Sequence, residues 1–480
     1  MQKISQFFQK NYLLLTLFAA SIGTRIFYFG RPNEIVFDEV YFGKFVINYF
    51  SASNYFDIHP PFGKLLIFFF AKIFGFNFLE NVAPETLLAD PKNLFILRLM
   101  PLIFGVLLIP LVYKFVELIS KSKKTAALST FFILSDNAFL IYSHYLFLDI
   151  ILVFFGILAL YLFFLGLNYQ RKEKFHISCD RIKCEKTTTK GQILYFLLSA
   201  LVLGATISIK WTGLAIFGII IATLIWKTVR KGLTLKISFV SLVIFIIIPV
   251  IFYLATFAIH FALLKKSGPD DGFFSTAYLK TLKNYSASPD IMPLSFFGKF
   301  KEINKTMFTS NSKLSATHPY SSKWWQWPFS QKPIYLWQGK IMNMNMNKKT
   351  ANLWLFGNLI IWLASFLGIV FTAIAILFKR LRKKLPTIIF WLLFAYLANL
   401  LPFIFIKRVL FLYHYFFAIT FAIIILSIFL ERIMTLYPKY KIAVYLFLIL
   451  TFIFFIVFSP LSYGFSESVR LYNFQLKIIL

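Results

Sequence analysis

Two polar segments near the start of the chain hold the residues whose types could do chemistry. Asp38 and Glu39 stand side by side in FDEVYFGKF, and His59 and Lys64 follow about twenty residues later in DIHPPFGK. A carboxylate in such a place can act as a general base on a hydroxyl group. Polar groups are costly to keep in so apolar a chain, which favours a chemical role. The alternative is a hydrated loop between membrane helices, with its carboxylates facing water.

The composition identifies a membrane protein. Of the 480 residues, 59% are hydrophobic and 14% are charged, whereas about a quarter of a soluble protein is charged. Several apolar runs are close to the twenty residues or so that a membrane-spanning helix needs. The net charge of +31 would suggest nucleic acid in a soluble protein. Here the basic residues gather in short loops between apolar runs, so they indicate membrane orientation and not nucleic-acid binding.

We therefore predict an all-α polytopic membrane protein with about eleven spans. The expected spans are 11–30, 94–116, 125–142, 146–167, 192–210, 212–226, 237–263, 352–378, 386–406, 409–430 and 442–463. The first resembles a signal peptide, but the many later spans favour a retained helix. The stretch 65–78 is short and carries Lys72, which predicts a re-entrant or interfacial helix.

The charges predict the orientation. With a cytoplasmic N-terminus, the short inner segments hold 25 basic and five acidic residues, while the first outer loop, 31–93, holds five basic and seven acidic residues. This is the positive-inside pattern, and an odd number of spans leaves the C-terminus extracytoplasmic. We expect three parts: an N-terminal catalytic module over 1–263, an extracytoplasmic loop region over 264–350 and a C-terminal membrane module over 351–480.

This topology brings ionisable residues at the span ends to the outer side. Besides the first-loop residues they are Arg25, Arg98, Asp149, Lys210, Lys407, Arg408 and His414. Snorkelling explains some of the basic side chains, but not the carboxylates and the histidine among them. The collection predicts an active site at the outer membrane face.

The 264–350 loop contains an aromatic segment, ATHPYSSKWWQWPFSQKPIYLWQG. Its residues His318, Tyr320, Trp325 and Trp327 could line a rigid cleft for a sugar or a peptide. An interfacial aromatic belt is the alternative. Cys179 and Cys184 lack the usual zinc spacings, and we expect them to be incidental thiols in a cytoplasmic loop.

A lipid-phosphate donor suits a site of this kind, because its tail stays in the bilayer while its phosphate reaches the interface. Arg25 and Arg98 could bind that phosphate through charge-assisted hydrogen bonds. A nearby carboxylate could remove the proton of an attacking hydroxyl group. No diphosphate or ligand cluster calls for a metal ion, so we expect no metal and no cofactor.

Five segments, in order, resemble the protein O-mannosyltransferases, a family of the GT-C superfamily of polytopic glycosyltransferases. They are FDEVYFGKF with DIHPPFGK, DNAFLIYSHYLFLD, GATISIKWTGL, HPYSSKWWQWP with KPIYLW, and FLYHY. The resemblance implies inverting transfer of mannose from a polyprenyl-phosphate-mannose donor to Ser or Thr hydroxyls of secreted or membrane proteins. It implies that Asp38 is the catalytic carboxylate, Glu39 its neighbour in the pair, and Arg98 an arginine associated with the donor phosphate.

The outer loop has no room for the soluble MIR domain of fungal and animal members. The resemblance is therefore to a prokaryotic type, which implies a multi-pass plasma-membrane protein with an extracytoplasmic site; a dimer is compatible with it.

Two other functions remain open. A related transferase, similar to the aminoarabinose transferases, would use the same kind of donor with a lipid or glycan acceptor. A transporter would use Asp149 and Lys210 as a coupling pair and would need broken helices near the midplane and inverted repeats. Neither of these two features is visible in the sequence.

Overall fold

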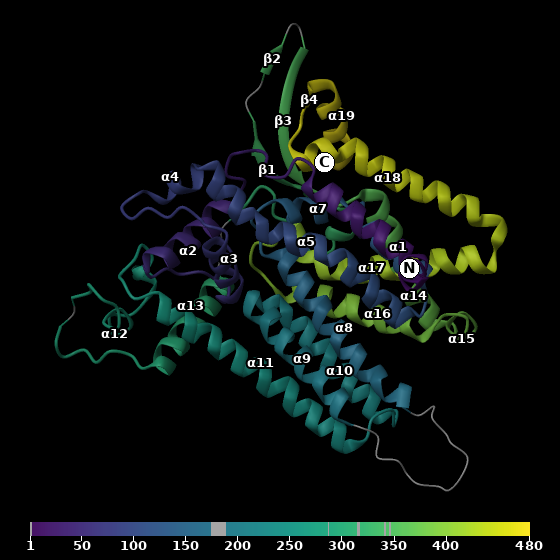
Figure 1. The fold of residues 1–480 in the computed structure, drawn as a ribbon, viewed down its shortest axis with the longest axis horizontal. Helices are drawn as coiled ribbons and strands as arrows, with labels where there is room; N and C mark the ends of the chain where they lie inside the picture. Colours follow the sequence, from purple (N-terminus) through teal and green to yellow (C-terminus); the bar gives the residue numbers. More distant parts are fainter. Residues whose placement is uncertain (1, 174–188, 287, 314–316, 340–341, 345–346) are drawn as a thin grey trace.

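The structure is a computed structural model that describes residues 2–173, 189–286, 288–313, 317–339, 342–344 and 347–480 (Figure 1). Cys179 and Cys184 lie outside the described residues. The α-helices are α1 Gln2–Ile26, α2 Glu39–Ser51, α3 Phe62–Ile73, α4 Pro84–Ala89, α5 Pro91–Ser120, α6 Lys123–Leu134, α7 Asn137–His144, α8 Asp149–Glu173, α9 Thr189–Ile209, α10 Leu214–Val229, α11 Leu235–Leu263, α12 Thr276–Leu279, α13 Phe296–Lys313, α14 Leu359–Leu377, α15 Lys379–Arg382, α16 Thr387–Leu400, α17 Phe416–Leu436, α18 Lys441–Tyr463 and α19 Val469–Ile479. Short 3₁₀ helices are η1 Trp211–Gly213, η2 Asp271–Phe273, η3 Trp327–Phe329, η4 Leu401–Phe405, η5 Leu412–Tyr415 and η6 Pro438–Tyr440.

The helical membrane architecture is confirmed. Among the described residues, nine helices are long and apolar enough to cross a membrane, or ten if one bent pair counts as a span. The bent pair is α6 and α7, within the expected span 125–142, and α1 takes the place of the expected first span. The count of eleven, which includes both, stays a prediction. The short α3 overlaps the stretch 65–78, which was expected to be too short to span.

The break between α6 and α7 is a feature that the sequence did not reveal. The two helices meet at 64°. Asp136 caps α7 by accepting hydrogen bonds from the backbone N–H groups of Ala138 and Phe139. Its carboxylate also accepts from the N–H of Asn358 and from Trp362 Nε1, at 3.1 and 2.7 Å. These bonds satisfy a buried carboxylate and fasten the break to the start of α14.

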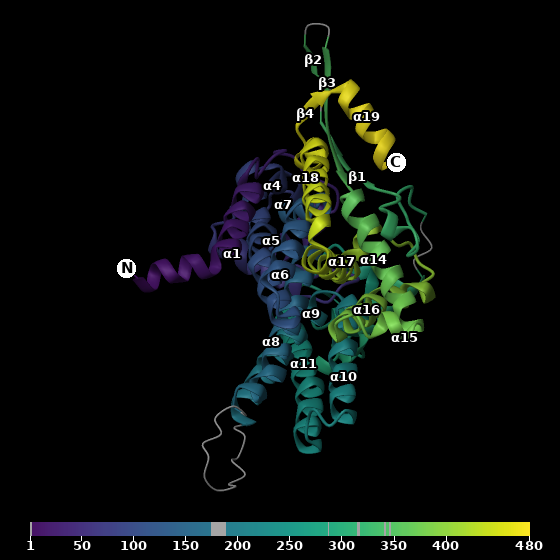
Figure 2. The same ribbon diagram turned by 90° about the vertical axis from the view of Figure 1, so that its right-hand side faces the viewer.

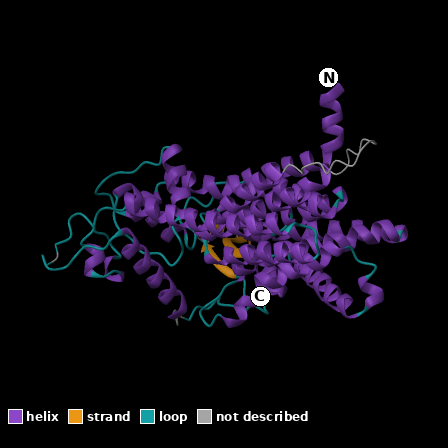
Figure 3. Ribbon diagram, turned by 90° about the horizontal axis from the view of Figure 1, so that it is seen from below, coloured by secondary structure: helices purple, strands orange, loops and turns teal. Residues whose placement is uncertain are grey.

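A small antiparallel sheet joins the predicted loop region 264–350 to the predicted C-terminal membrane module 351–480. Strand β3, Asn347–Leu355, pairs with β1 Ile334–Gln338, β2 Met342–Met344 and β4 Ser466–Ser468. The strands gather in one place (Figure 3), and β2 and β3 project near α19 (Figure 2). The expected span 352–378 therefore begins too early, and the boundary at 350 cuts β3. The apolar end of β3 runs into the apolar α14, and the side chain of Asn358, which caps α14, marks the change.

The first loop folds back over one end of the bundle. Its helices α2 and α3 contact each other, and α3 also packs against α5 and α9. Helix α13 lies beside the same end of α11 (Figure 1). The polar segments of the sequence therefore meet at one end of the spans.

Candidate functional site

Asp38 and Glu39 have different surroundings although they are adjacent. Glu39 is buried and accepts four hydrogen bonds: from Arg98 Nε and Nη2, at 2.8 and 2.6 Å, and from the backbone N–H groups of Val36 and Leu146, both at 2.8 Å. Asp38 is half-buried, begins α2 without capping it, and accepts no side-chain hydrogen bond from any described residue. Of the pair, only Asp38 has a carboxylate free to react.

Burial raises the pKa of Asp38 to about 6, against an opposing effect of Lys210 and with smaller contributions from Asp149 and Asp57. The carboxylate is thus ionised near neutral pH but holds a proton more readily than an ordinary aspartate. A base with a pKa close to the working pH is efficient at taking a proton from a hydroxyl group.

The two arginines expected to bind a phosphate are both buried. Arg98 donates to the carbonyl oxygens of Pro32 and Glu34 as well as to Glu39, at 2.7 and 2.8 Å, and its guanidinium lies over the ring of Tyr145. Arg25 donates to Thr24 Oγ1 and to the carbonyl oxygen of Leu134. Neither side chain is more than 1% exposed. This geometry favours a structural role for both.

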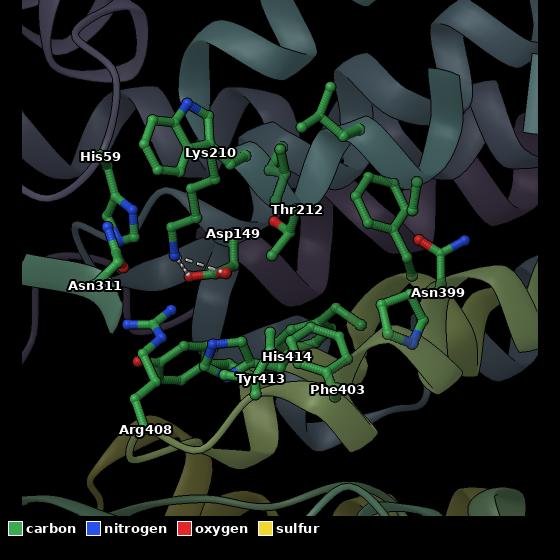
Figure 4. A pocket seen from close by; sticks show the side chains of 18 of the residues that line it. His59, Asp149, Lys210, Thr212, Asn311, Asn399, Phe403, Arg408, Tyr413 and His414 are labelled. Atoms are coloured by element: carbon green, nitrogen blue, oxygen red, sulfur yellow. Dashed lines mark hydrogen bonds and ion pairs between the residues drawn. The ribbon is translucent and has the colours of Figure 1, made fainter. Parts of the chain in front are cut away.

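A cavity of about 750 Å³ lies at the same end of the bundle. One part is polar, with His59, Asp149, Lys210, Asn311, Arg408 and His414 in its wall. The rest is apolar, and its wall includes Leu152, Leu214, Phe308, Phe403, Phe405 and Phe417. In Figure 4 the side chains of His59, Lys210 and Arg408 lie toward one side, and Asn399 and Phe403 toward the other. The cavity is therefore amphiphilic.

The ion pair of Asp149 and Lys210 lies in the wall of this cavity. Lys210 Nζ donates to both carboxylate oxygens of Asp149, at 2.9 and 2.8 Å, and lies over the ring of Tyr413. The pair joins the start of α8 to the residue that follows α9. An ammonium group has three N–H donors, so one remains for a bound molecule.

Arg408 and His59 complete the polar end. Arg408 lies in the loop between η4 and η5, and its guanidinium makes no hydrogen bond or ion pair to a described residue. Burial, with Lys210 and Lys64 nearby, holds the pKa of His59 well below its usual range, so the ring is neutral. Lys64 bonds to the Asp57 carboxylate and donates to the carbonyl oxygen of His59 at 2.7 Å. It thereby fixes the loop that carries His59.

His414 is held on both faces of its ring. It stacks on Trp327 and Tyr413, with ring centroids 5.8 and 4.6 Å apart, and Phe403 meets it edge-on. Its Nδ1 lies 3.0 Å from the carbonyl oxygen of Phe411. Trp327 is fully buried and donates from Nε1 to Ser322 Oγ. Trp327, which the sequence predicted to line a cleft, thus supports the cavity wall by packing against His414.

The other aromatic residues of that segment lie elsewhere. His318 packs between Phe37 and Phe411, and Tyr320 packs against Trp354 of β3. Trp325 is 48% exposed. His318 and Tyr320 connect the first loop to the sheet, while Trp325 matches the alternative of an interfacial aromatic.

Some residues of the cavity were not predicted. Asn311 of α13 donates from Nδ2 to the carbonyl oxygen of Ile58, 253 positions away, and Tyr413 lies beneath Lys210. Tyr413 belongs to the FLYHY segment and could have been included. Asn311 carries no local signal, because only the packing of α13 brings it to the first loop. Among the described residues, no three His, Cys, Asp or Glu side chains converge as metal ligands do, and independence from metal stays a prediction.

Comparison with known proteins identifies a family whose models match this chain. The model of the dolichyl-phosphate-mannose-protein mannosyltransferase family matches residues 14–265, and the model of the C-terminal four-helix membrane region of protein-O-mannosyltransferases matches 296–476. A dolichyl-phosphate-mannose–protein mannosyltransferase 6 of Candida albicans is 31% identical over 55% of this chain and 33% of its own length. Protein O-mannosyl-transferase 2 of Drosophila melanogaster is 28% identical over 58% of this chain and 36% of its own. The match thus spans about a third of the length of these relatives.

Two solved structures have a similar fold. The S. cerevisiae protein O-mannosyltransferase Pmt1–Pmt2 complex, bound to the sugar donor, superposes with a TM-score of 0.81 at 18% identity, over 95% of this chain and 90% of that one. The Archaeoglobus fulgidus oligosaccharyltransferase gives a TM-score of 0.54 at 15% identity, over 98% of this chain and 60% of that one. With a family model that covers more than half of its residues, the chain belongs to the dolichyl-phosphate-mannose-protein mannosyltransferase family.

Proposed function

We propose that this protein transfers mannose from a polyprenyl-phosphate-mannose donor to serine or threonine hydroxyls of proteins, with inversion. The observation that carries the proposal is the amphiphilic cavity together with the free carboxylate of Asp38, whose pKa is affected by the charges of Lys210 and Asp149 in the cavity wall. A lipid-phosphate sugar needs cations for its phosphate, an apolar space for its tail and a base near the acceptor. Family membership supports the same reaction.

Arg408 and Lys210 would bind the donor phosphate in place of Arg25 and Arg98. Arg408 has no protein partner, and Lys210 keeps one donor beyond its bonds to Asp149. A guanidinium can give two parallel hydrogen bonds to a phosphate. The neutral ring of His59 faces the same end (Figure 4) and can hydrogen-bond to the sugar without repelling the two cations.

The isoprenoid tail would leave through the apolar side of the cavity. Three side chains in its wall are largely exposed: Leu214 by 49%, Phe308 by 64% and Phe405 by 84%. In water such exposure is unfavourable, whereas in a bilayer it costs nothing. This favours a mouth that opens toward lipid.

The reaction needs one base and one leaving group. As the acceptor oxygen attacks the anomeric carbon of mannose, Asp38 takes the hydroxyl proton and the bond from that carbon to the phosphate oxygen breaks. The polyprenyl phosphate leaves with the electron pair, stabilised by Arg408 and Lys210. Attack on the face opposite the leaving group inverts the anomeric centre, as in inverting glycosidases.

The setting of this reaction is also part of the proposal. The positive-inside charge pattern supports a site on the extracytoplasmic side of the membrane. The proposed membrane is a prokaryotic plasma membrane, with secreted or membrane proteins as acceptors. A dimer is compatible with the likeness to the two-subunit yeast complex.

Donor binding and transfer, measured on the same membranes, test the proposal. Arg408→Ala should weaken binding of a labelled polyprenyl-phosphate mannose by about 10- to 150-fold, because a charged hydrogen bond contributes about 1.5–3 kcal/mol. Arg408→Lys should recover part of the affinity, since it keeps the charge and loses the fork. Lys323→Ala, in the exposed part of the outer loop, is the matched control and should bind normally. Unchanged affinity in Arg408→Ala would remove Arg408 from the site. If the protein binds the donor normally but transfers mannose to a lipid or glycan and not to a Ser/Thr peptide, the acceptor is not a protein.

A further inference from the structure

Helix α13 presents a continuous exposed row that no described residue covers. The row is Phe297, Lys301, Lys305, Phe308 and Ser312, here named the α13 row, and its members recur every three or four residues along one side. Phe297 is 68% exposed and Phe308 is 64% exposed. Two large rings on the surface of one helix need an apolar neighbour.

The opposite side of α13 is packed against the protein. Ile303 and Met307 are buried in a small core with residues of α11 and α12. Lys299 is also buried, with its ammonium 4.5 Å from the ring centre of Phe261 and 4.8 Å from that of Tyr278. The α13 row is therefore the side of α13 that faces away from the protein, on a helix that is packed against it.

The contacts of α13 with α11 indicate how deep α13 lies relative to the membrane. Going along α13, Phe296 meets Phe261, Phe300 meets Phe257, and Asn304 accepts a hydrogen bond from Tyr253 at 2.6 Å. The two helices thus run antiparallel, and α13 descends along the last eleven residues of α11, from Leu263 back to Tyr253, which is about 15 Å of helix. A helix of 29 residues is about 43 Å long, and the hydrocarbon core is about 30 Å thick. At most about 13 Å of α11 can project beyond that core, so α13 at Tyr253 lies no farther out than the headgroup layer.

The charges of α13 match a lipid surface. The helix has four lysines and one acidic residue, Glu302. Glu302 accepts hydrogen bonds from the N–H and Oγ of Ser275 and is not part of the row. The exposed Lys301 and Lys305 are thus unopposed along the row, a pattern that suits anionic lipid headgroups.

We infer that the α13 row lies in the membrane interface at the cavity end of the bundle, with Phe308 at its inner end against the acyl chains, Lys301 and Lys305 at lipid phosphates, and Phe297 at the outer edge of the headgroup layer. The row continues the lipid-facing side of α11, where Ile251 and Ile259 are also exposed. Because Phe308 and Asn311 belong to the cavity wall, the anchored helix holds that wall at the level of the headgroups. The inference does not depend on which reaction the protein catalyses.

Site-directed labelling tests the depth of the row. In a Cys179→Ser/Cys184→Ser background, single cysteines replace Phe297, Lys301, Phe308 and, as a water-exposed control in the same loop, Asp290. The full-length protein in lipid nanodiscs is spin-labelled, and collision with oxygen is compared with collision with a water-soluble nickel complex. At 308 oxygen should dominate and at 290 nickel should dominate, while 301 should lie between the two and 297, farther out along the helix, should lie between 301 and 290. Nickel access at 308 equal to that at 290 would overturn the inference. Low access to both reagents there would show a protein partner on the row, which would overturn it too.

The charge component has its own readout. Nanodiscs of phosphatidylcholine are compared with nanodiscs that also contain phosphatidylglycerol. The anionic lipid should raise the melting temperature of the parent protein, and Lys301→Gln/Lys305→Gln should abolish that rise. Lys349→Gln, an exposed lysine of β3, is the matched control and should keep it. An equal rise in the double variant would overturn the contact with anionic headgroups.

Discussion

At the scale of single residues, the two adjacent carboxylates of the first loop are separated by their hydrogen bonds. Glu39 uses both oxygens to hold Arg98 and two backbone N–H groups. Asp38 has no such partner, and burial raises its pKa to about 6. Intrinsic acidity is nearly the same in aspartate and glutamate. The environment therefore assigns the proposed base to Asp38 and a structural role to Glu39.

The pH dependence of transfer should follow Asp38. Because its pKa is raised to about 6, the carboxylate is charged above that pH and takes up a proton below it. Turnover should therefore fall as the pH drops through about 6, close to tenfold for each further unit. The measurement is the rate of mannose transfer to a Ser/Thr peptide at saturating donor. A rate that stays flat down to pH 4.5 would exclude a base with this pKa.

Replacing the same carboxylate separates chemistry from binding. Asp38→Asn keeps the shape and removes the basicity, so turnover should fall by about 10²–10⁴-fold while donor affinity stays within a few-fold. The variant should fold normally, because it removes a charge that is costly to bury. Asp290→Asn, an exposed carboxamide exchange, should leave both quantities unchanged. A near-normal rate in Asp38→Asn would move the base to Glu39 or Asp149.

At the scale of elements, one buried ion pair fastens three segments together. Arg98 belongs to the first turns of α5, Glu39 begins α2, and Leu146 follows α7. Arg98 also holds the carbonyl oxygens of Pro32 and Glu34, which precede Asp38 in the chain. The arginine thus positions the first loop against the bundle instead of facing the cavity.

Removing Arg98 should therefore act on stability. Arg98→Ala leaves the buried Glu39 carboxylate without its partner, and breaking such a pair costs about 3–5 kcal/mol. The thermal unfolding temperature should drop clearly, and Arg98→Ala/Glu39→Gln should regain part of the loss. Lys114→Ala, which breaks the partly exposed pair with Glu117, should change stability by only about 0–1 kcal/mol. A variant Arg98→Ala that unfolds like the parent but binds donor weakly would return Arg98 to the phosphate site.

At the scale of the whole molecule, the two ends of the spans differ in the residues that they carry. The cavity, the first loop, α13 and the proposed base share one end. The short connections at the other end carry most of the excess positive charge, as in α15 with its Lys379, Arg380 and Arg382. Positive loops stay in the cytoplasm, so the cavity end should be extracytoplasmic.

Reporter fusions test this orientation. A reporter after Leu480 should be extracytoplasmic and one within the 168–190 loop should be cytoplasmic. The expectation requires that α1 and the bent pair α6–α7 each cross the membrane together with the nine other helices. Both reporters on one side would mean that one of the seven candidate spans between them, α9, α10, α11, α14, α16, α17 or α18, does not cross.

The sequence by itself determined the class and the identity of the segments that meet, and it predicts the orientation. Apolar run length and loop charge depend on local composition, which is readable along the chain. The same holds for Asp38, Asp149, Lys210, Arg408 and His414, which are polar residues at the edges of apolar runs. The sheet was missed because β3 ends in an apolar stretch that leads into α14. The two together form one apolar run, whose length predicted a single span.

Only the tertiary structure decided which charges are free. In the sequence Arg98 is the arginine expected at the phosphate and Arg408 a further site candidate. In the structure Glu39, 59 positions from Arg98, satisfies Arg98, and no described side chain satisfies Arg408. Likewise Asn311 reaches the first loop only through the docking of α13 on α11. Whether a charge is neutralised depends on distances of a few ångströms between remote segments. Spacing along the chain carries no record of those distances, because the fold alone brings the partners together.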